Sequence, residues 1–301
     1  MGTPAPHPAG AEEAAHGGLP AGSALIGRSL AAAGVFAAAA AALAFLLLPI
    51  VAIFARVSPT KLVEQLSRPV VIDALVVSLK ANGIAQALVL VLGTPTAYLL
   101  ATRRFRGRSL LVVLVELPLV LPPAVAGIGL IAAFGRFGLL GDTLNAFGIQ
   151  LGLTQAAVVI AVAYVSSPLY IRQAIATFEG IDPNLVAASR TLGAGRTRTF
   201  FRIVLPVSRR GLAAGEALAF ARGLGEFGAT IMFAGSLQGV TQTLPLAIYQ
   251  QFDVLPDGFT TALAMSALLV IVSGALLVAL RLALQWQPSK PPSRFLFAPS
   301  R

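Results

Sequence analysis

The 301-residue sequence contains no cysteine, which excludes disulfides, thiolate metal sites, iron–sulfur clusters and cysteine nucleophiles. It has only two histidines, His7 and His16, and both lie in a polar segment near the N-terminus. No pair of imidazoles is therefore available in the apolar part of the chain to bind haem or to relay protons. These absences argue against a membrane redox enzyme.

Charged residues are also scarce. They make up 11% of the chain, whereas a soluble domain carries about a quarter. Hydrophobic residues make up 56%, and the mean hydropathy is +0.83. Such a chain has too few charged groups to cover a surface that faces water, so we expect most of it to lie in lipid.

The sequence lacks the G-x-x-x-x-G-K-[ST] loop that holds nucleotide phosphates. Its apolar segments contain no serine–histidine pair and no cluster of metal ligands. We therefore expect this chain to have no catalytic residues, no metal and no cofactor, and not to hydrolyse ATP itself.

Six apolar runs are long enough to cross a hydrocarbon core of about 30 Å, which needs roughly 20 helical residues. They cover residues 30–55, 73–101, 109–134, 154–177, 211–233 and 259–284. None shows the strict alternation of a membrane β-barrel, so we predict an all-α membrane protein with six transmembrane helices. The predicted organisation is a disordered cytoplasmic tail over residues 1–27, a transmembrane domain over 28–286 and a cytoplasmic tail over 287–301.

Basic residues are unevenly distributed between the loops. Arginines cluster in residues 103–108 and 190–210, whereas residues 234–257 contain no lysine or arginine. Because basic loops stay in the cytoplasm, this bias places both termini there. It also accounts for the net charge of +10 without a nucleic-acid partner. We expect a multi-pass protein of the plasma membrane, surrounded by membrane lipid.

Residues 182–206 are too long for a turn and too polar for a membrane span. The first part, PNLVAASRTLG, has Pro183 at an early helical position and Gly193 where helices often end. The second part, RTRTFFRIVLP, mixes apolar residues with arginines and is expected to end at Pro206. We predict two short amphipathic helices at the cytoplasmic surface, either in lipid headgroups or docked in a groove of a partner protein.

The spacing of residues in this loop resembles the cytoplasmic signature of importer-type ABC-transporter permeases. In that signature an E-A-A triplet is followed after three residues by Gly and after nine more by I-x-L-P. The triplet here has Ala187 at its first position, so the acidic residue is missing. The resemblance implies that the loop is the coupling helix, which inserts into a cleft on an ATP-binding subunit. The residues that it implicates in coupling are Ala187, Ala188, Gly193, Ile203, Leu205 and Pro206.

Four longer strings resemble the molybdate branch of these permeases, and sulfate and thiosulfate permeases are related. The strings are SLKANGIAQALVLVLGTPTAYLLA, ELPLVLPPAVAGIGL, FARGLGEFGATIMFAGS and TQTLPLAIY. The resemblance implies a second permease copy, two ATP-binding subunits that hold ATP and magnesium, and an extracytoplasmic substrate-binding protein that delivers molybdate. Import of sulfate, thiosulfate or tungstate is the alternative, and a proton-coupled transporter using Glu226 or Glu216 is a different class.

The fifth run carries small residues at intervals of four, namely Gly211, Gly215, Ala219 and Gly223. Such a stripe allows close helix packing, either within the chain or near a pathway shared with a second copy. In the same run Arg222 and Glu226 are four residues apart, which predicts an ion pair or a polar gate. The residues we expect at the translocation pathway are Gly223, Arg222, Glu226, Gly228 and Thr230.

Two other segments leave alternatives open. The third run contains Pro118, Pro122 and Pro123, which predict a kink that either faces the cavity or merely bends the helix. Residues 234–258 are polar and lack basic groups, which suits docking of a binding protein and equally suits a solvated turn.

Overall fold

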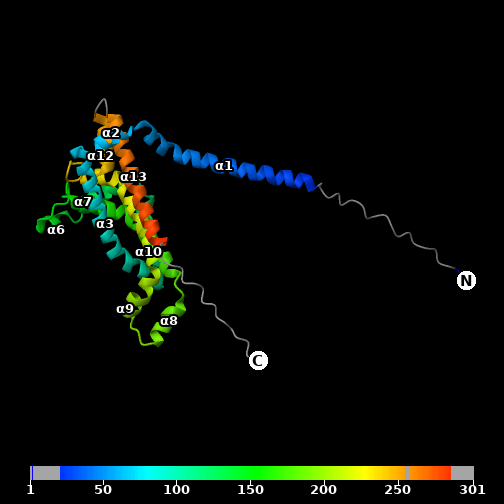
Figure 1. Ribbon diagram of the computed structural model, residues 1–301. Helices are drawn as coiled ribbons and strands as arrows, with labels where there is room; N and C mark the ends of the chain where they lie inside the picture. The colour runs from blue at the N-terminus through cyan, green and yellow to red at the C-terminus, as the bar shows by residue number, and fades with distance from the viewer. Residues whose placement is uncertain (1, 3–20, 255–257, 286–301) are drawn as a thin grey trace. The chain divides into compact units, whose positions relative to one another are not determined.

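The computed structural model describes residues 2, 21–254 and 258–285, and the regular elements of these ranges are all helices (Figure 1). Of the predicted tails, 1–27 and 287–301, residues 1, 3–20 and 287–301 lie outside the described residues. The chain divides into two compact units, Met1–Ala52 and Ile53–Arg301. The first unit contains most of helix α1 (Ala21–Arg56). Residues 21–27, predicted as tail, are instead helical and form the first turns of α1.

The second unit holds the other helices. In chain order they are α2 (Pro59–Leu66), α3 (Pro69–Thr102), α4 (Arg108–Val120), α5 (Pro123–Phe134), α6 (Gly141–Ala146), α7 (Gln155–Glu179), α8 (Pro183–Thr191), α9 (Arg196–Thr199), the π-helical turn η1 (Phe200–Val204), α10 (Leu205–Leu224), α11 (Gly228–Ala234), α12 (Leu244–Val254) and α13 (Gly258–Gln285).

Four described helical segments are long and apolar enough to cross a membrane: Ala32–Arg56, Pro69–Thr102, Gln155–Glu179 and Gly258–Ala279. They correspond to the first, second, fourth and sixth predicted runs. The third run is instead the pair α4 and α5, bent by 116°, which makes five spans if the pair is counted as one. The proline kink is therefore present. The fifth run is also broken, because α10 ends at Leu224 and α11 begins at Gly228.

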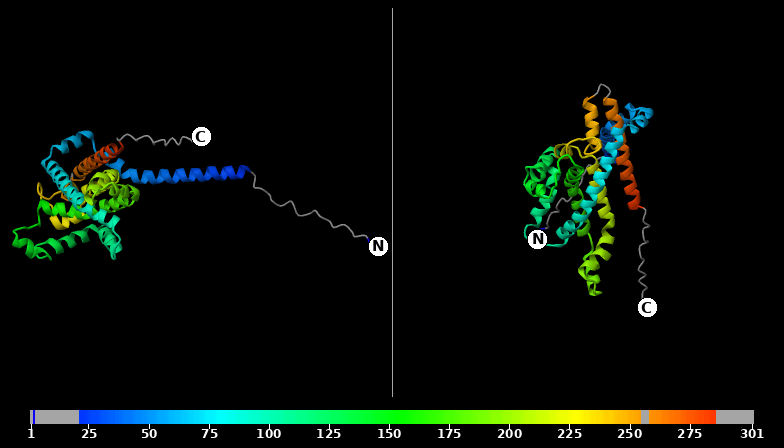
Figure 2. Two further views of the ribbon diagram at one scale, coloured as in Figure 1. Left: turned by 90° about the horizontal axis from the view of Figure 1, so that it is seen from below. Right: turned by 90° about the vertical axis from the view of Figure 1, so that its left-hand side faces the viewer.

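Helices α3, α7 and α10 pack against one another at the centre of the second unit (Figure 1, Figure 2). Gly93 of α3 lies against Tyr170 of α7, and an added Cβ would come within 3.0 Å of the tyrosine ring. Tyr170 is fully buried, and its hydroxyl forms a hydrogen bond of 2.6 Å with the Thr94 hydroxyl. Close approach of this kind supplies the van der Waals contact that holds membrane helices together.

The second predicted surface helix does not end at Pro206. Residues 196–224 form one helical run, because α9 continues through η1 into α10. In η1 the Leu205 N–H donates to the Phe200 carbonyl, five residues earlier. The wider turn relieves the clash between a proline ring and the carbonyl four residues before it, which normally kinks or ends a helix. The prediction of a separate short helix is therefore wrong for this segment.

Candidate functional site

Helix α8 presents the residues of the predicted coupling loop. The Asp182 side chain caps its N-terminus by accepting a hydrogen bond of 2.9 Å from the Asn184 N–H, and Pro183 opens the first turn. After its last turn, Gly193 has a φ of +80°, a conformation that favours glycine. The helix followed by glycine is thus confirmed, and the cap residues show why it forms.

The predicted coupling residues fall into two groups. Ala187 and Ala188 are exposed on α8. Ile203 and Leu205 are half-buried in η1 and at the start of α10, and Leu205 packs against the cluster of buried residues from α3, α7 and α10. Pro206 is exposed beside them. Of the two groups, therefore, only the alanines of α8 lie next to each other on the outer surface.

A buried contact ties α8 to the helix that follows. The Ser189 hydroxyl donates to the Val186 carbonyl at 2.8 Å and lies 3.1 Å from the Thr199 hydroxyl of α9. Both side chains are buried, whereas the next leucine, Leu192, is 88% exposed. The contact between the two hydroxyls thus joins α8 to the helical run that leads into α10.

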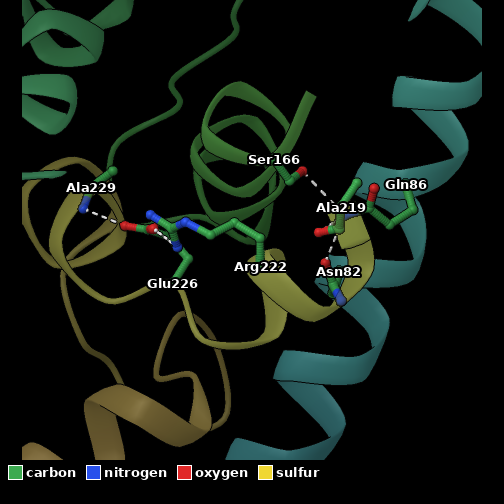
Figure 3. A network of polar contacts seen from close by, with 7 residues as sticks. All are labelled: Asn82, Gln86, Ser166, Ala219, Arg222, Glu226 and Ala229. Atoms are coloured by element: carbon green, nitrogen blue, oxygen red, sulfur yellow. Dashed lines mark hydrogen bonds and ion pairs between the residues drawn. The ribbon is translucent and has the colours of Figure 1, made fainter. Parts of the chain in front are cut away.

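A network of amides and a hydroxyl joins α3, α7 and α10 (Figure 3). The Asn82 side-chain amide donates to the Phe220 carbonyl at 3.0 Å. The Gln86 amide donates to Asn82 Oδ1 at 3.0 Å and to Ser166 Oγ at 3.1 Å. It also lies 3.3 Å from the Ala219 carbonyl oxygen. Analysis of the sequence missed Gln86 and Ser166, although polar residues four apart in an apolar run, such as Asn82 and Gln86, are a usable signal.

The break between α10 and α11 is built around one carboxylate (Figure 3). Glu226 Oε2 lies 2.7 Å from the Arg222 guanidinium, and its side chain is 1% exposed. Its other oxygen accepts a hydrogen bond of 2.8 Å from the Ala229 N–H. The carboxylate thereby satisfies an N–H in the first turn of α11, which has no partner within the helix. The predicted ion pair is confirmed, and the role of the pair as a gate stays a prediction.

The stripe of small residues on α10 packs inside the chain. A Cβ at Gly211 would overlap Thr177 of α7, and one at Gly215 would come within 2.9 Å of Gln173. A Cβ at Gly223 would overlap Asn82 Oδ1 of α3. The intrachain interpretation of the stripe is therefore confirmed.

The predicted pathway residues lie together at the end of α10 and in α11, and several are inaccessible. Gly223, Glu226 and Thr230 are buried, while Arg222 and Gly228 are half-buried. A Cβ at Gly228 would come within 2.6 Å of the Pro123 side chain of α5, so α11 and α5 pack closely. Beside the break lies an apolar groove of about 430 Å³, lined in part by Phe227, Tyr249 and Phe252.

Several polar residues in the described part of the segment 234–252 are buried, whereas a solvated turn would expose them. Thr241, Gln242 and Thr243 are all buried. The Thr241 hydroxyl accepts a hydrogen bond of 2.9 Å from the Leu237 N–H, and the Leu244 N–H donates to Ser78 Oγ at 2.7 Å. The first bond holds the segment to itself, and the second fixes its backbone to α3. Among the residues that the structure describes, no three His, Cys, Asp or Glu residues form a metal-binding group.

The chain belongs to the family described as the binding-protein-dependent transport system inner membrane component, whose model matches residues 93–285. Its relatives in this family are transport permeases of the membrane. The molybdenum transport system permease protein ModB of Mycobacterium tuberculosis is 44% identical over 241 residues, 79% of this chain and 89% of that protein. ModB of Escherichia coli is 42% identical over 215 residues, 71% of this chain and 92% of that protein.

Solved structures agree on the fold. A chain of a bacterial alginate ABC transporter, crystallised with its alginate-bound periplasmic protein, superposes with a TM-score of 0.67 at 15% identity, over 87% of this chain and 96% of that chain. A chain of the MetNI methionine ABC transporter superposes with a TM-score of 0.56 at 19% identity, over 72% of this chain and 95% of that chain. The predicted all-α fold of ABC-importer permeases is confirmed.

Proposed function

We propose that the chain is the permease subunit of an ATP-driven molybdate importer. The observation that carries this proposal is the identity of 44% and 42% to two ModB proteins over 89% and 92% of their lengths. The subunit would form the pathway with a second copy and would not catalyse ATP hydrolysis itself.

The proposed mechanism passes work from an ATPase into the membrane helices. Two ATP-binding subunits, which hold ATP and magnesium, close on ATP and pull on residues 182–206. The exposed Ala187 and Ala188 support α8 as the contact surface, and the bond between Ser189 and Thr199 supports transmission to α10. Rigid-body motion of the helices then alternates access to the pathway.

The proposed topology has six spans with both termini in the cytoplasm. The spans are α1, α3, the pair α4 and α5, α7, the pair α10 and α11, and α13. Under this topology the arginine clusters at residues 103–108 and 190–210 face the cytoplasm. The opposite face would receive the substrate-binding protein.

The pair of Arg222 and Glu226 supports an anionic cargo. A fixed carboxylate beside the route of a dianion would repel it, but the guanidinium at 2.7 Å compensates that charge. The pair would thus allow molybdate to pass close to the break between α10 and α11. Tungstate, sulfate and thiosulfate share this charge, so uptake measurements must separate them.

The test is transport by vesicles that contain the chain, its ATPase subunit and its binding protein. We expect ATP-dependent uptake of molybdate that exceeds uptake of sulfate and thiosulfate, with tungstate as the nearest competitor. Preferred uptake of sulfate would assign the alternative substrate. Uptake driven by a proton gradient without ATP would refute the ABC mechanism.

A further inference from the structure

A basic groove of about 1100 Å³ lies beside α8, between this helix and the ends of α3 and α7. It is lined by five arginines from separate parts of the chain: Arg103, Arg104, Arg108, Arg190 and Arg196. Three of them follow α3 and two flank the turn between α8 and α9. The fold thus brings two arginine-rich segments, far apart in the sequence, to one concave surface.

Most of this charge is not neutralised by the protein. Glu179 is the one acidic residue that lines the groove, and it already pairs with Arg108 at 2.5 Å. Within the described part of the chain, no carboxylate forms an ion pair with Arg104, Arg190 or Arg196. A cavity lined by several unpaired guanidiniums favours an anion with multiple acceptor oxygens, such as a phosphate group.

The floor of the groove is aromatic. Tyr98, Phe178 and Phe200 line it, with ring centroids 4.8 Å apart for Tyr98 and Phe200 and 5.4 Å apart for Tyr98 and Phe178. Phe201 also lines the groove and is 60% exposed. A ligand that combines a phosphate with an apolar part would match both the arginines and this floor.

The position of the groove along the helices identifies the source of such a ligand. α3 ends at Thr102 and α7 ends at Glu179, and both helices are long and apolar enough to span a membrane. Both spanning helices therefore end beside the groove, on the face that the basic loops assign to the cytoplasm. We propose that the groove binds the phosphate of an anionic phospholipid from the cytoplasmic leaflet.

Native mass spectrometry of the full-length chain tests this proposal. The protein is released from micelles that contain phosphatidylglycerol and phosphatidylcholine in equal amounts, and the bound lipids are counted. We expect the unmodified chain to retain phosphatidylglycerol in preference. Combining Arg104→Gln, Arg190→Gln and Arg196→Gln should weaken this retention by at least about tenfold.

A matched control removes the same charge outside the groove. Arg106, Arg198 and Arg202 are exposed, lie in the same segments and do not line the cavity. Changing all three to Gln should alter retention by less than about twofold. Equal losses in both triple variants would refute a built site, because net charge alone would then explain the retention.

Two further outcomes would overturn the proposal. Equal retention of both lipids by the unmodified chain would show that the groove does not distinguish an anionic phospholipid from a zwitterionic one. Thermal protection of the lipid-free chain by inorganic phosphate, without protection by phosphatidylglycerol, would assign the groove to a soluble anion. If the groove triple variant does not fold, Arg190→Gln alone is compared with Arg198→Gln alone.

Discussion

Gly223 is the position where the packing of α10 makes the sharpest prediction. An alanine there would place its Cβ on Asn82 Oδ1, 2.9 Å from Val162 Cγ1 and 3.0 Å from Gln86 Nε2. The first contact is with a short amide side chain that itself bonds to the Phe220 carbonyl and the Gln86 amide. Gly223→Ala must therefore displace α10 or break the buried network.

The magnitude follows from three opposing effects. Replacing glycine by alanine within a helix gains up to about 1 kcal/mol of stability. Overpacking costs about 1–3 kcal/mol, and each buried hydrogen bond that is lost costs about 1 kcal/mol more. We expect the free energy of unfolding to fall by about 1–3 kcal/mol in total.

Reversible unfolding in mixed detergent micelles measures this change. The matched control is Gly225→Ala, two residues further on, where the nearest atom to an added Cβ is the Arg222 carbonyl oxygen at 4.0 Å. The control should stay within about 0.5 kcal/mol of the unmodified chain. In the background Asn82→Ala, the cost of Gly223→Ala should fall by at least about 0.5 kcal/mol, because the main obstacle is gone. A Gly223→Ala protein as stable as the control would refute the reasoning.

Three further changes test other parts of the chain by the same unfolding assay. Glu226→Ala should destabilise by about 1–3 kcal/mol, since the Arg222 guanidinium and the Ala229 N–H both lose their acceptor. Glu226→Gln keeps one acceptor oxygen and should cost less. Equal costs for the two variants would contradict the role of the carboxylate as acceptor. Gly193→Val should cost about 1–2 kcal/mol because φ is +80°, and Gly193→Asn should cost less. Gly193→Val should also weaken capture of the ATPase subunit by the tagged chain more than Gly193→Asn does. Unchanged capture by both variants would argue against coupling through α8. Pro206→Ala should change stability by less than about 1 kcal/mol, because the wide turn already accommodates the ring, and a large gain would show that the proline strains the helix.

The sequence was sufficient to predict the features that depend on local composition. Hydrophobic length located four of the spans, and the pattern of proline, small residues and glycine located α8 and its end at Gly193. Pro206 was misinterpreted because a proline normally ends or kinks a helix, and the π-helical turn that accommodates it has no signal of its own in the sequence. The segment 234–258 left two interpretations open for a related reason: a polar side chain is read as solvated unless its buried partner, such as the Leu237 N–H for the Thr241 hydroxyl, is known.

Glu226 shows how a correct contact can be predicted for an incomplete reason. A spacing of four predicts a pair with Arg222 on a continuous helix, yet α10 ends at Leu224, so the carboxylate lies beyond it. The ion pair forms across the break, where the same side chain also accepts the Ala229 N–H. Both oxygens are thus held by donors, one at the end of α10 and one in α11, so the carboxylate joins the two helices across the break.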